Sequence, residues 1–389
     1  MKSYLLAERT IDKADLTDLK DWLETDPWLT QGPLVRQFEA AWAAWLGRKH
    51  ALFVNSGSSA NLLMYAALLA QKDLPNRKVI VPAVSWATTV APAIQLGFEP
   101  IMCDADPQTF GLDLTELEAL CQKHKPATVI AVHVLGTPND MERLCDLRRR
   151  YGFVLLEDAC AATGSRWDGA HVGTFGELSS FSFFYGHHLS TIEGGMVTTD
   201  DEATHDLLLQ LRSHGWAKDL APEKGDALAR QAGAIPFNKP FTFYLPGFNV
   251  RGTDLQARIG LSQLKKADHV VARRAENHRR YQERLGGQAG FQIQHCPRSI
   301  TSSISFCALA SSPAHRERIG AAMAAQRIET RPIGGGNMSR QPFWAERYGA
   351  AVFPMADRIH QTGFQLPNHP GLSLTDVDFI CDTVLAVTE

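Results

Sequence analysis

Two adjacent histidines, His187 and His188, lie in the stretch of the chain that is richest in potential chemistry. They follow a phenylalanine-rich run that starts at Phe181 and precede a Glu-Gly-Gly triplet that begins at Glu193. No nearby carboxylate or cysteine completes a metal-ligand set, and neighbours in an extended segment point to opposite sides. We therefore expect no metal here. A histidine can instead move a proton near neutral pH, so this stretch favours acid–base catalysis.

Small hydroxyl residues follow an apolar run at residues 55–60, which read Asn-Ser-Gly-Ser-Ser-Ala. At the start of a helix, such residues offer N–H and O–H donors to a phosphate, and the helix dipole helps. An ordinary N-cap explains the same residues equally well, because serine is a preferred capping residue. The segment is thus a candidate phosphate site or a plain helix start.

An aromatic residue and an acidic pair end two further apolar runs. Trp86 follows the run at 79–81 and either stacks on a planar cofactor or belongs to a core or interface. Glu157 and Asp158 end the run at 153–156. An aspartate there either pairs with a protonated ring nitrogen, because opposite charges keep both groups ionised, or caps the next turn.

The elements around these residues alternate in type. Short β-type runs occur at 50–54, 79–81, 101–104, 128–134, 153–156, 179–184 and 196–199, with helical patterns at 60–69, 114–123 and 141–150. Apolar strands separated by helices predict a mostly parallel sheet covered on both faces. Active sites of such sheets gather at the carboxyl ends of the strands.

The second half of the chain changes character. Residues 218–242 are polar and rich in proline and glycine, so we expect a long loop there. The pattern at 254–285 predicts a helix with many arginines. These arginines form either a solvated face or a binding patch. A strand at 303–309, a helix at 316–327, a strand at 329–332 and a terminal helix opened by Thr375 follow. We expect a large domain at 1–250 and a smaller α+β domain at 251–389.

Composition limits the class of protein. The 389 residues hold 39 Lys and Arg against 42 Asp and Glu, which argues against nucleic acid or a membrane surface as the main partner. No apolar run is long enough to form a membrane helix or a signal-peptide core, and the seven cysteines show no ligand spacing. We expect a reduced, cytoplasmic protein.

Taken together, the four chemical segments resemble one family: the pyridoxal-phosphate-dependent sugar aminotransferases and dehydratases of fold type I, the DegT/DnrJ/EryC1/StrS group. The likeness extends to Arg-Ser-His-Gly-Trp at 212–216 and Pro-Gly-Phe-Asn-Val-Arg at 246–251. It implies an aspartate-aminotransferase-like α/β fold, with a central, mostly parallel sheet and a smaller C-terminal domain.

The resemblance also implies roles for individual residues. Trp86 would stack on the pyridine ring, and Asp158 would pair with the ring N–H. The cofactor phosphate would be held by Ser56, Gly57, Ser58 and Ser182, with Asn249 reaching over from a second subunit of a homodimer. The candidates for binding glutamate or the sugar nucleotide are His214, Arg251 and Arg331.

His187 departs from the aminotransferase pattern. Family aminotransferases carry a lysine six residues before the glutamate of the Glu-Gly-Gly triplet, and that lysine binds the cofactor covalently. Counting back from Glu193 gives His187, which cannot form such a link. This change resembles the dehydratase branch. A related branch with an iron–sulfur cluster is disfavoured because its clustered cysteines are missing. Ala161 also departs, since relatives carry Gln or Glu there.

The implied reaction is removal of the C3 hydroxyl from a nucleotide-linked 4-keto-6-deoxyhexose, with GDP-4-keto-6-deoxy-D-mannose as the expected substrate. Glutamate would convert pyridoxal phosphate to pyridoxamine phosphate, and the reaction would release ammonia. The product would enter lipopolysaccharide O-antigen synthesis on the route to colitose. Two alternatives remain: an aminotransferase whose lysine comes from elsewhere in the chain, and a catalytically silent regulatory relative.

Overall fold

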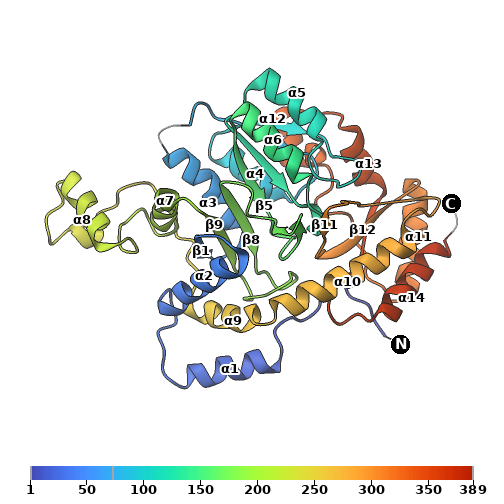
Figure 1. Cartoon of the computed structure of the whole chain (residues 1–389), viewed down its shortest axis with the longest axis horizontal. Helices are drawn as coiled ribbons and strands as arrows, with labels where there is room; N and C mark the ends of the chain where they lie inside the picture. Colours follow the sequence, from blue (N-terminus) through green and yellow to red (C-terminus); the bar gives the residue numbers. More distant parts are fainter. Residues whose placement is uncertain (1, 72–73, 388–389) are drawn as a thin grey trace.

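A seven-stranded sheet forms the centre of the computed structural model, which describes residues 2–71 and 74–387 (Figure 1). The strands lie in the order β1-β9-β8-β5-β4-β2-β3, and all run parallel except β9, which is antiparallel to both of its neighbours. Their bounds are β1 His50–Val54, β2 Lys78–Pro82, β3 Glu99–Cys103, β4 Thr128–Val132, β5 Val154–Asp158, β8 Leu178–Ser182 and β9 Gly195–Thr199. The predicted sheet is confirmed.

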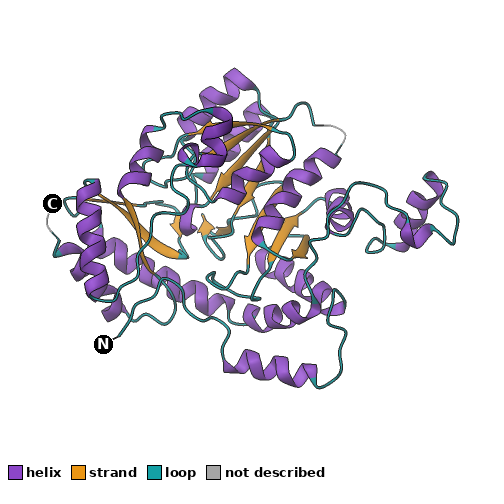
Figure 2. Ribbon diagram, turned by 180° about the vertical axis from the view of Figure 1, so that it is seen from behind, coloured by secondary structure: helices purple, strands orange, loops and turns teal. Residues whose placement is uncertain are grey.

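Helices cover both faces of this sheet, because successive strand residues point to opposite sides. In β1, for example, Leu52 and Val54 pack into one apolar cluster, whereas Ala51 and Phe53 pack into another. On the first face lie α3 Gly57–Ala70, α4 Ala87–Gln95 and α7 Glu202–Arg212. The second face carries α2 Pro33–Leu46, α5 Leu114–His124, α6 Met141–Tyr151 and α9 Asp254–Leu264. Figure 2 shows this layering from behind.

The C-terminal part has a sheet of its own, in the order β10-β12-β13. The long helix α10 runs beneath it, and the N-terminus lies beside α14 (Figure 1). The elements are α10 Ala267–Leu285, β10 Phe291–Ile293, β12 Ser305–Ala310, α11 Pro313–Ala325, α12 Pro342–Tyr348, α13 Pro354–Thr362, β13 Gly363–Pro367 and α14 Leu374–Leu385. The division of the chain at residue 250 stays a prediction.

The remaining elements are short or peripheral. Strands β6 Arg166–Trp167, β7 Ala170–His171 and β11 Ser299–Ile300 form a small third sheet. Helix α1 spans Lys13–Leu23, and short 3₁₀ turns are η1 Val134–Gly136, η2 Lys239–Phe241 and η3 Met338–Arg340. Within residues 2–71 and 74–387, no helix combines the length and the apolar character needed to cross a bilayer.

The predicted loop at 218–242 was partly wrong, because it contains helix α8, Pro222–Gln231. Pro222 occupies the first helical turn, where its missing N–H costs nothing. Lys224 then pairs with Glu202 and Asp206 of the neighbouring α7 region. The segment projects from the body as an arm (Figure 1).

Three predictions in the C-terminal part were also wrong in detail. The single helix at 254–285 is two helices that break at Lys265 and Lys266. Residues 329–332 form no strand, since Pro332 has no N–H with which to continue a ladder. The last helix is capped by Ser373 rather than Thr375, because the Ser373 hydroxyl accepts from the Asp376 N–H.

The two acids at the end of β5 take different roles, and Glu157 is structural. Its side chain is fully buried and accepts hydrogen bonds from the backbone N–H groups of Gly173, Phe175 and Gly176. It also faces His133 Nε2 at 3.1 Å. Burial opposes ionisation, but the His133 contact and the N–H donors outweigh it and lower the pKa of Glu157. The carboxylate thus fixes the turn between β7 and β8.

Substituting Glu157→Ala should destabilise the fold by about 3 kcal/mol or more, since it leaves buried N–H groups without acceptors. Denaturant unfolding measures this change. The control Asp140→Ala removes only the N-cap of α6 and should cost about 1 kcal/mol. Equal losses for the two variants would contradict the structural role of Glu157.

Candidate active site

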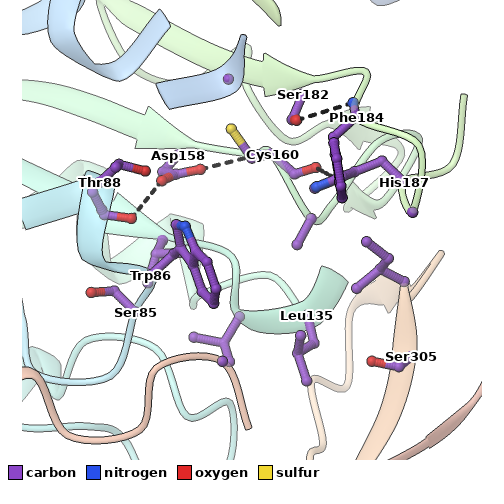
Figure 3. Close-up of a pocket in the computed structure, with 18 of the residues that line it drawn as sticks. Ser85, Trp86, Thr88, Leu135, Asp158, Cys160, Ser182, Phe184, His187 and Ser305 are labelled. Atoms are coloured by element: carbon purple, nitrogen blue, oxygen red, sulfur yellow. Dashed lines mark hydrogen bonds between the residues drawn. The ribbon is translucent and has the colours of Figure 1, made fainter. Parts of the chain in front are cut away.

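A cavity of about 600 Å³ opens at the carboxyl ends of the parallel strands. Loops that follow β1, β2, β4, β5 and β8 line one side of it, and Ile304, Ser305, Arg331 and Gln365 of the C-terminal part line the other. Figure 3 shows Trp86, Asp158 and His187 on the side of the strand ends and Ser305 on the side of the C-terminal part. A cavity thus lies where we expect the site, since the sheet brings separate strand ends to one edge.

The start of α3 forms one wall of the cavity. The Ser56 hydroxyl accepts from the Ser59 N–H at 3.0 Å, so the N-cap interpretation is correct for Ser56. The hydroxyls of Ser58 and Thr88 lie 2.9 Å apart nearby. A Cβ atom on Gly57 would come within 2.7 Å of Ser182 Cβ, so only glycine fits between α3 and the end of β8. Unpaired N–H groups and hydroxyls at a helix start favour an anion such as phosphate.

Asp158 lies deeper in the same cavity. Its side chain is buried, and one carboxylate oxygen accepts from Asn61 Nδ2 at 2.9 Å and from Thr89 Oγ1 at 2.7 Å. The other oxygen accepts from the Cys160 N–H at 3.1 Å. Asp158 therefore both caps the turn at Cys160, as one of the two interpretations predicted, and presents a fixed carboxylate to the cavity. A buried carboxylate held in this way suits a cationic partner such as a protonated ring nitrogen.

Trp86 stands at the mouth of the cavity. Its side chain is 63% exposed, so the core interpretation of this tryptophan is wrong. The indole lies beside Asp158 in the view of the pocket (Figure 3). An exposed aromatic face at this place can cover a planar ring.

His187 is held in one tautomer by the backbone. Its Nδ1 lies 2.7 Å from the carbonyl oxygen of Cys160 (Figure 3). A carbonyl only accepts, so Nδ1 carries the hydrogen and Nε2 is left as the unprotonated nitrogen. Burial and the positive charge of Arg274 lower the pKa of His187 to about 4. The imidazole is therefore neutral at pH 7, and Nε2 has a lone pair that can accept a hydrogen.

His188 is separated from the cavity although it is the next residue. Its side chain is almost fully buried, and Nε2 lies 2.7 Å from the carbonyl oxygen of Ser302. Only His187 of the pair lines the cavity. In residues 2–71 and 74–387, no cluster of three His, Cys, Asp or Glu side chains could hold a metal.

Eight of the predicted site residues line the cavity: Ser56, Gly57, Ser58, Trp86, Asp158, Ser182, His187 and Arg331. The other three do not line it. The backbones of Asn249 and Arg251 form isolated antiparallel β-bridges with Ser213 and Val54, respectively. The His214 ring lies against the Trp216 ring. The roles of these three residues stay predictions.

Sequence reasoning missed several residues of the site. Asn61 and Thr89 hold Asp158, and their helical spacing from Gly57 and Trp86 is a signal that could have found them. Leu6 and Ala7 of the N-terminal segment also line the cavity, and no sequence signal points to them.

The profile of the DegT/DnrJ/EryC1/StrS aminotransferase family matches residues 9–385. GDP-4-keto-6-deoxy-D-mannose 3-dehydratase of Yersinia pseudotuberculosis is 36% identical over 342 residues, which cover 87% of this chain and 86% of that protein.

Two crystal structures of GDP-4-keto-6-deoxymannose-3-dehydratase are similar throughout. A mutant with bound GDP-perosamine has a TM-score of 0.90 at 29% identity and covers 98% of this chain and 100% of its own. A second, with a trapped PLP–glutamate geminal diamine, has a TM-score of 0.89 at 29% identity and the same coverage.

The fold and the cavity define a fold type I pyridoxal-phosphate-dependent enzyme. More particularly, the chain belongs to the DegT/DnrJ/EryC1/StrS aminotransferase family. The residues present fit the cofactor: a glycine-lined helix start suits its phosphate, the Asp158 carboxylate suits its ring nitrogen, and the Trp86 indole suits its ring face.

Substituting Gly57→Ala should weaken binding of pyridoxal phosphate by tenfold or more, about 1.4 kcal/mol, because the new methyl group crowds Ser182 in the phosphate cradle. Titration of cofactor fluorescence measures the dissociation constant. The control Gly320→Ala adds a methyl group in open space on α11 and should leave binding unchanged. Equal affinities for both variants would contradict the cradle.

Proposed function

We propose that this protein is a dehydratase that removes the C3 hydroxyl of GDP-4-keto-6-deoxy-D-mannose, with glutamate as the amino donor. The observation that carries the proposal is the neutral imidazole of His187, which lines the cofactor cavity at the position where family aminotransferases carry lysine. The similar dehydratases support the same substrate.

Three lysines of the segment 218–242 have partners away from the cavity. Lys224 pairs with Glu202 and Asp206, Lys239 pairs with Asp226, and Lys218 lies 5.8 Å from the centre of the Trp216 ring. In the described part of the chain, no lysine lines the cavity. This arrangement argues against the aminotransferase alternative.

Each residue of the cavity would have a separate role in this reaction. When bound, pyridoxal phosphate and its pyridoxamine form supply an amino group taken from glutamate and an electron sink next to C4 of the sugar. Ser58 and Ser182 would hold the phosphate, and Asp158 would keep the ring nitrogen protonated. His187 Nε2 would take a proton from the carbon that bears the cofactor's amino group and deliver it to the departing C3 hydroxyl. Positioned proton transfer of this kind contributes about 10²- to 10⁴-fold in rate.

Arg331 is the cavity residue with the clearest fit to the anionic substrate. Its side chain is 54% exposed, and its nearest carboxylate, on Glu329, lies 3.7 Å away. The guanidinium thus keeps donors free for a carboxylate of glutamate or a phosphate of the nucleotide. Cytoplasmic location and entry of the product into the colitose branch of O-antigen synthesis stay predictions.

The reaction is tested by incubating the protein with GDP-4-keto-6-deoxy-D-mannose, pyridoxal phosphate and glutamate. NMR should show loss of oxygen at C3, with ammonia and 2-oxoglutarate released. An amino group at C4 in the product would establish the aminotransferase alternative instead. Absence of any turnover and of bound cofactor would establish a silent relative.

The variant His187→Lys should bind the cofactor covalently and lose C3 dehydration, since an amine replaces the proton-transferring imidazole. Borohydride reduction followed by peptide mass mapping detects the link, and the NMR assay measures the loss. Wild-type protein treated in the same way should show no cofactor-modified lysine. Dehydration by His187→Lys at the wild-type rate would show that His187 is not the base.

We also propose that the enzyme is a homodimer with shared sites. Asn249, Arg251 and His214 do not line the cavity of their own chain. In a dimer, these residues of one subunit would reach the cavity of the other subunit. The arm and its base carry exposed apolar side chains, as a subunit contact requires: Ile235 (57%), Phe237 (88%), Phe241 (73%) and Phe243 (57%).

Mixing of inactive variants tests this arrangement. After mixing and subunit exchange, His187→Ala and Asn249→Ala protomers should regain activity, because each hybrid dimer then contains one intact site. A His187→Ala and Asp158→Ala mixture is the control. It should stay inactive, since both residues belong to the cavity of one chain. No recovery in the first mixture, with exchange shown by mass, would contradict sharing through Asn249.

A further inference from the structure

The second histidine of the pair has no part in the reaction described above, yet it is built into the support of the site. We propose that His188 is a positioning residue: its Nε2–H donates to the Ser302 carbonyl and thereby fixes the loop that carries His187. The inference deepens the proposed dehydratase function and rests on it.

The environment of His188 rules out proton transfer by this side chain. Nε2 lies 2.7 Å from the Ser302 oxygen, so it carries the hydrogen, and Nδ1 is buried without a partner in the described residues. A second proton on Nδ1 would place a charge where nothing accepts it. Burial and the nearby charge of Arg274 hold the pKa of His188 well below its usual value. The side chain is thus a permanent neutral donor.

The acceptor of this bond belongs to a rigid segment. The Ser302 N–H donates to the Ser165 hydroxyl, which in turn donates to the Gly136 carbonyl at 2.7 Å. Asn368 Nδ2 donates to both the carbonyl and the hydroxyl of Ser303. The residues that follow, Ile304 and Ser305, line the cavity.

The guanidinium of Arg274 also binds the backbone of this segment. Its side chain is 1% exposed, and Nη1 donates to the carbonyls of Ile304, at 2.9 Å, and of Asn368. Its printed hydrogen bonds all go to backbone carbonyls, and the Glu8 carboxylate attracts its charge without forming a hydrogen bond to it in the described residues. Burying a cation is costly, and the contacts of Arg274 hold this wall of the cavity in place.

The residues before His187 are weakly held: Phe184 and Tyr185 are each 47% exposed, and the His187 N–H closes only a local turn onto the Phe184 carbonyl. The residues after His188 are buried and held elsewhere, since the Ser190 N–H donates to Gln263 Oε1 and the Thr191 N–H to the Phe183 carbonyl. The imidazole itself is held at Nδ1 by Cys160. His188 therefore supplies the bond that ties this loop to the fixed segment 302–304 and sets where Nε2 of His187 lies.

The variant His188→Phe tests the role, because it keeps a planar ring and removes the donor. We expect kcat for dehydration to fall about 100-fold, the loss that a displacement of roughly 1 Å produces, with KM and cofactor affinity unchanged. His188→Gln, whose amide reaches the Nε2 position, should restore most of the lost rate. His188→Asn, which is too short, should not. This amide pair tests the role even where the phenylalanine variant does not fold.

Two controls separate positioning from general stability. His315 is a buried histidine whose Nε2 also faces a backbone carbonyl, that of Val387, and it does not line the cavity. His315→Phe should lower the melting temperature without changing kcat. The double variant His187→Asn/His188→Phe should be no slower than His187→Asn alone, since His188 acts only through His187.

Release of 2-oxoglutarate from glutamate in a single turnover provides a second readout that needs no sugar. If His188→Phe dehydrates at the wild-type rate, or if the two losses add in the double variant, the inference is overturned and the dehydratase function stands. If wild-type protein releases 2-oxoglutarate but dehydrates no sugar, the proposed function fails. Slower release in His188→Phe would still support the positioning role.

Discussion

The hydrogen bond from His187 Nδ1 to the Cys160 carbonyl is the interaction on which the chemistry depends. It selects the tautomer in which Nε2 carries no hydrogen, and burial keeps the ring neutral. The carbonyl belongs to the same strand end that presents Asp158, whose carboxylate accepts from the Cys160 N–H. One short backbone segment therefore orients both the base and the anion of the site, and a change there would alter the two together.

The rest of the fold holds that segment still. Glu157, one residue earlier, satisfies three backbone N–H groups of the turn before β8, so the strand end cannot shift without leaving them unpaired. Asn61 and Thr89 bring the starts of α3 and α4 to Asp158. The resulting cavity combines a helix start for an anion, a fixed carboxylate and an exposed indole, and this set of groups matches the parts of pyridoxal phosphate.

Much of the architecture could be predicted from the sequence, because strands buried on both faces read as apolar runs and helices carry their own stop signals. The run at 50–54 matches β1, and the pattern at 141–150 lies within α6. The errors lie where local signals conflict. Proline at residue 222 indicated a loop but begins α8, and the apolar pattern at 254–285 continued across the break at Lys265.

The sequence by itself determined the family and the exchange of lysine for histidine at residue 187, since residue types at fixed spacing carry the chemistry of a cofactor site. The spacing already singled out His187, but only the tertiary structure showed what keeps His188 out of the cavity, because the two acceptors, the carbonyls of Cys160 and Ser302, are far away in the chain. It likewise showed what Glu157 does in the fold, whereas the resemblance had given a role only to Asp158. Neighbours on a strand point to opposite faces, and only packing decides which face is the core.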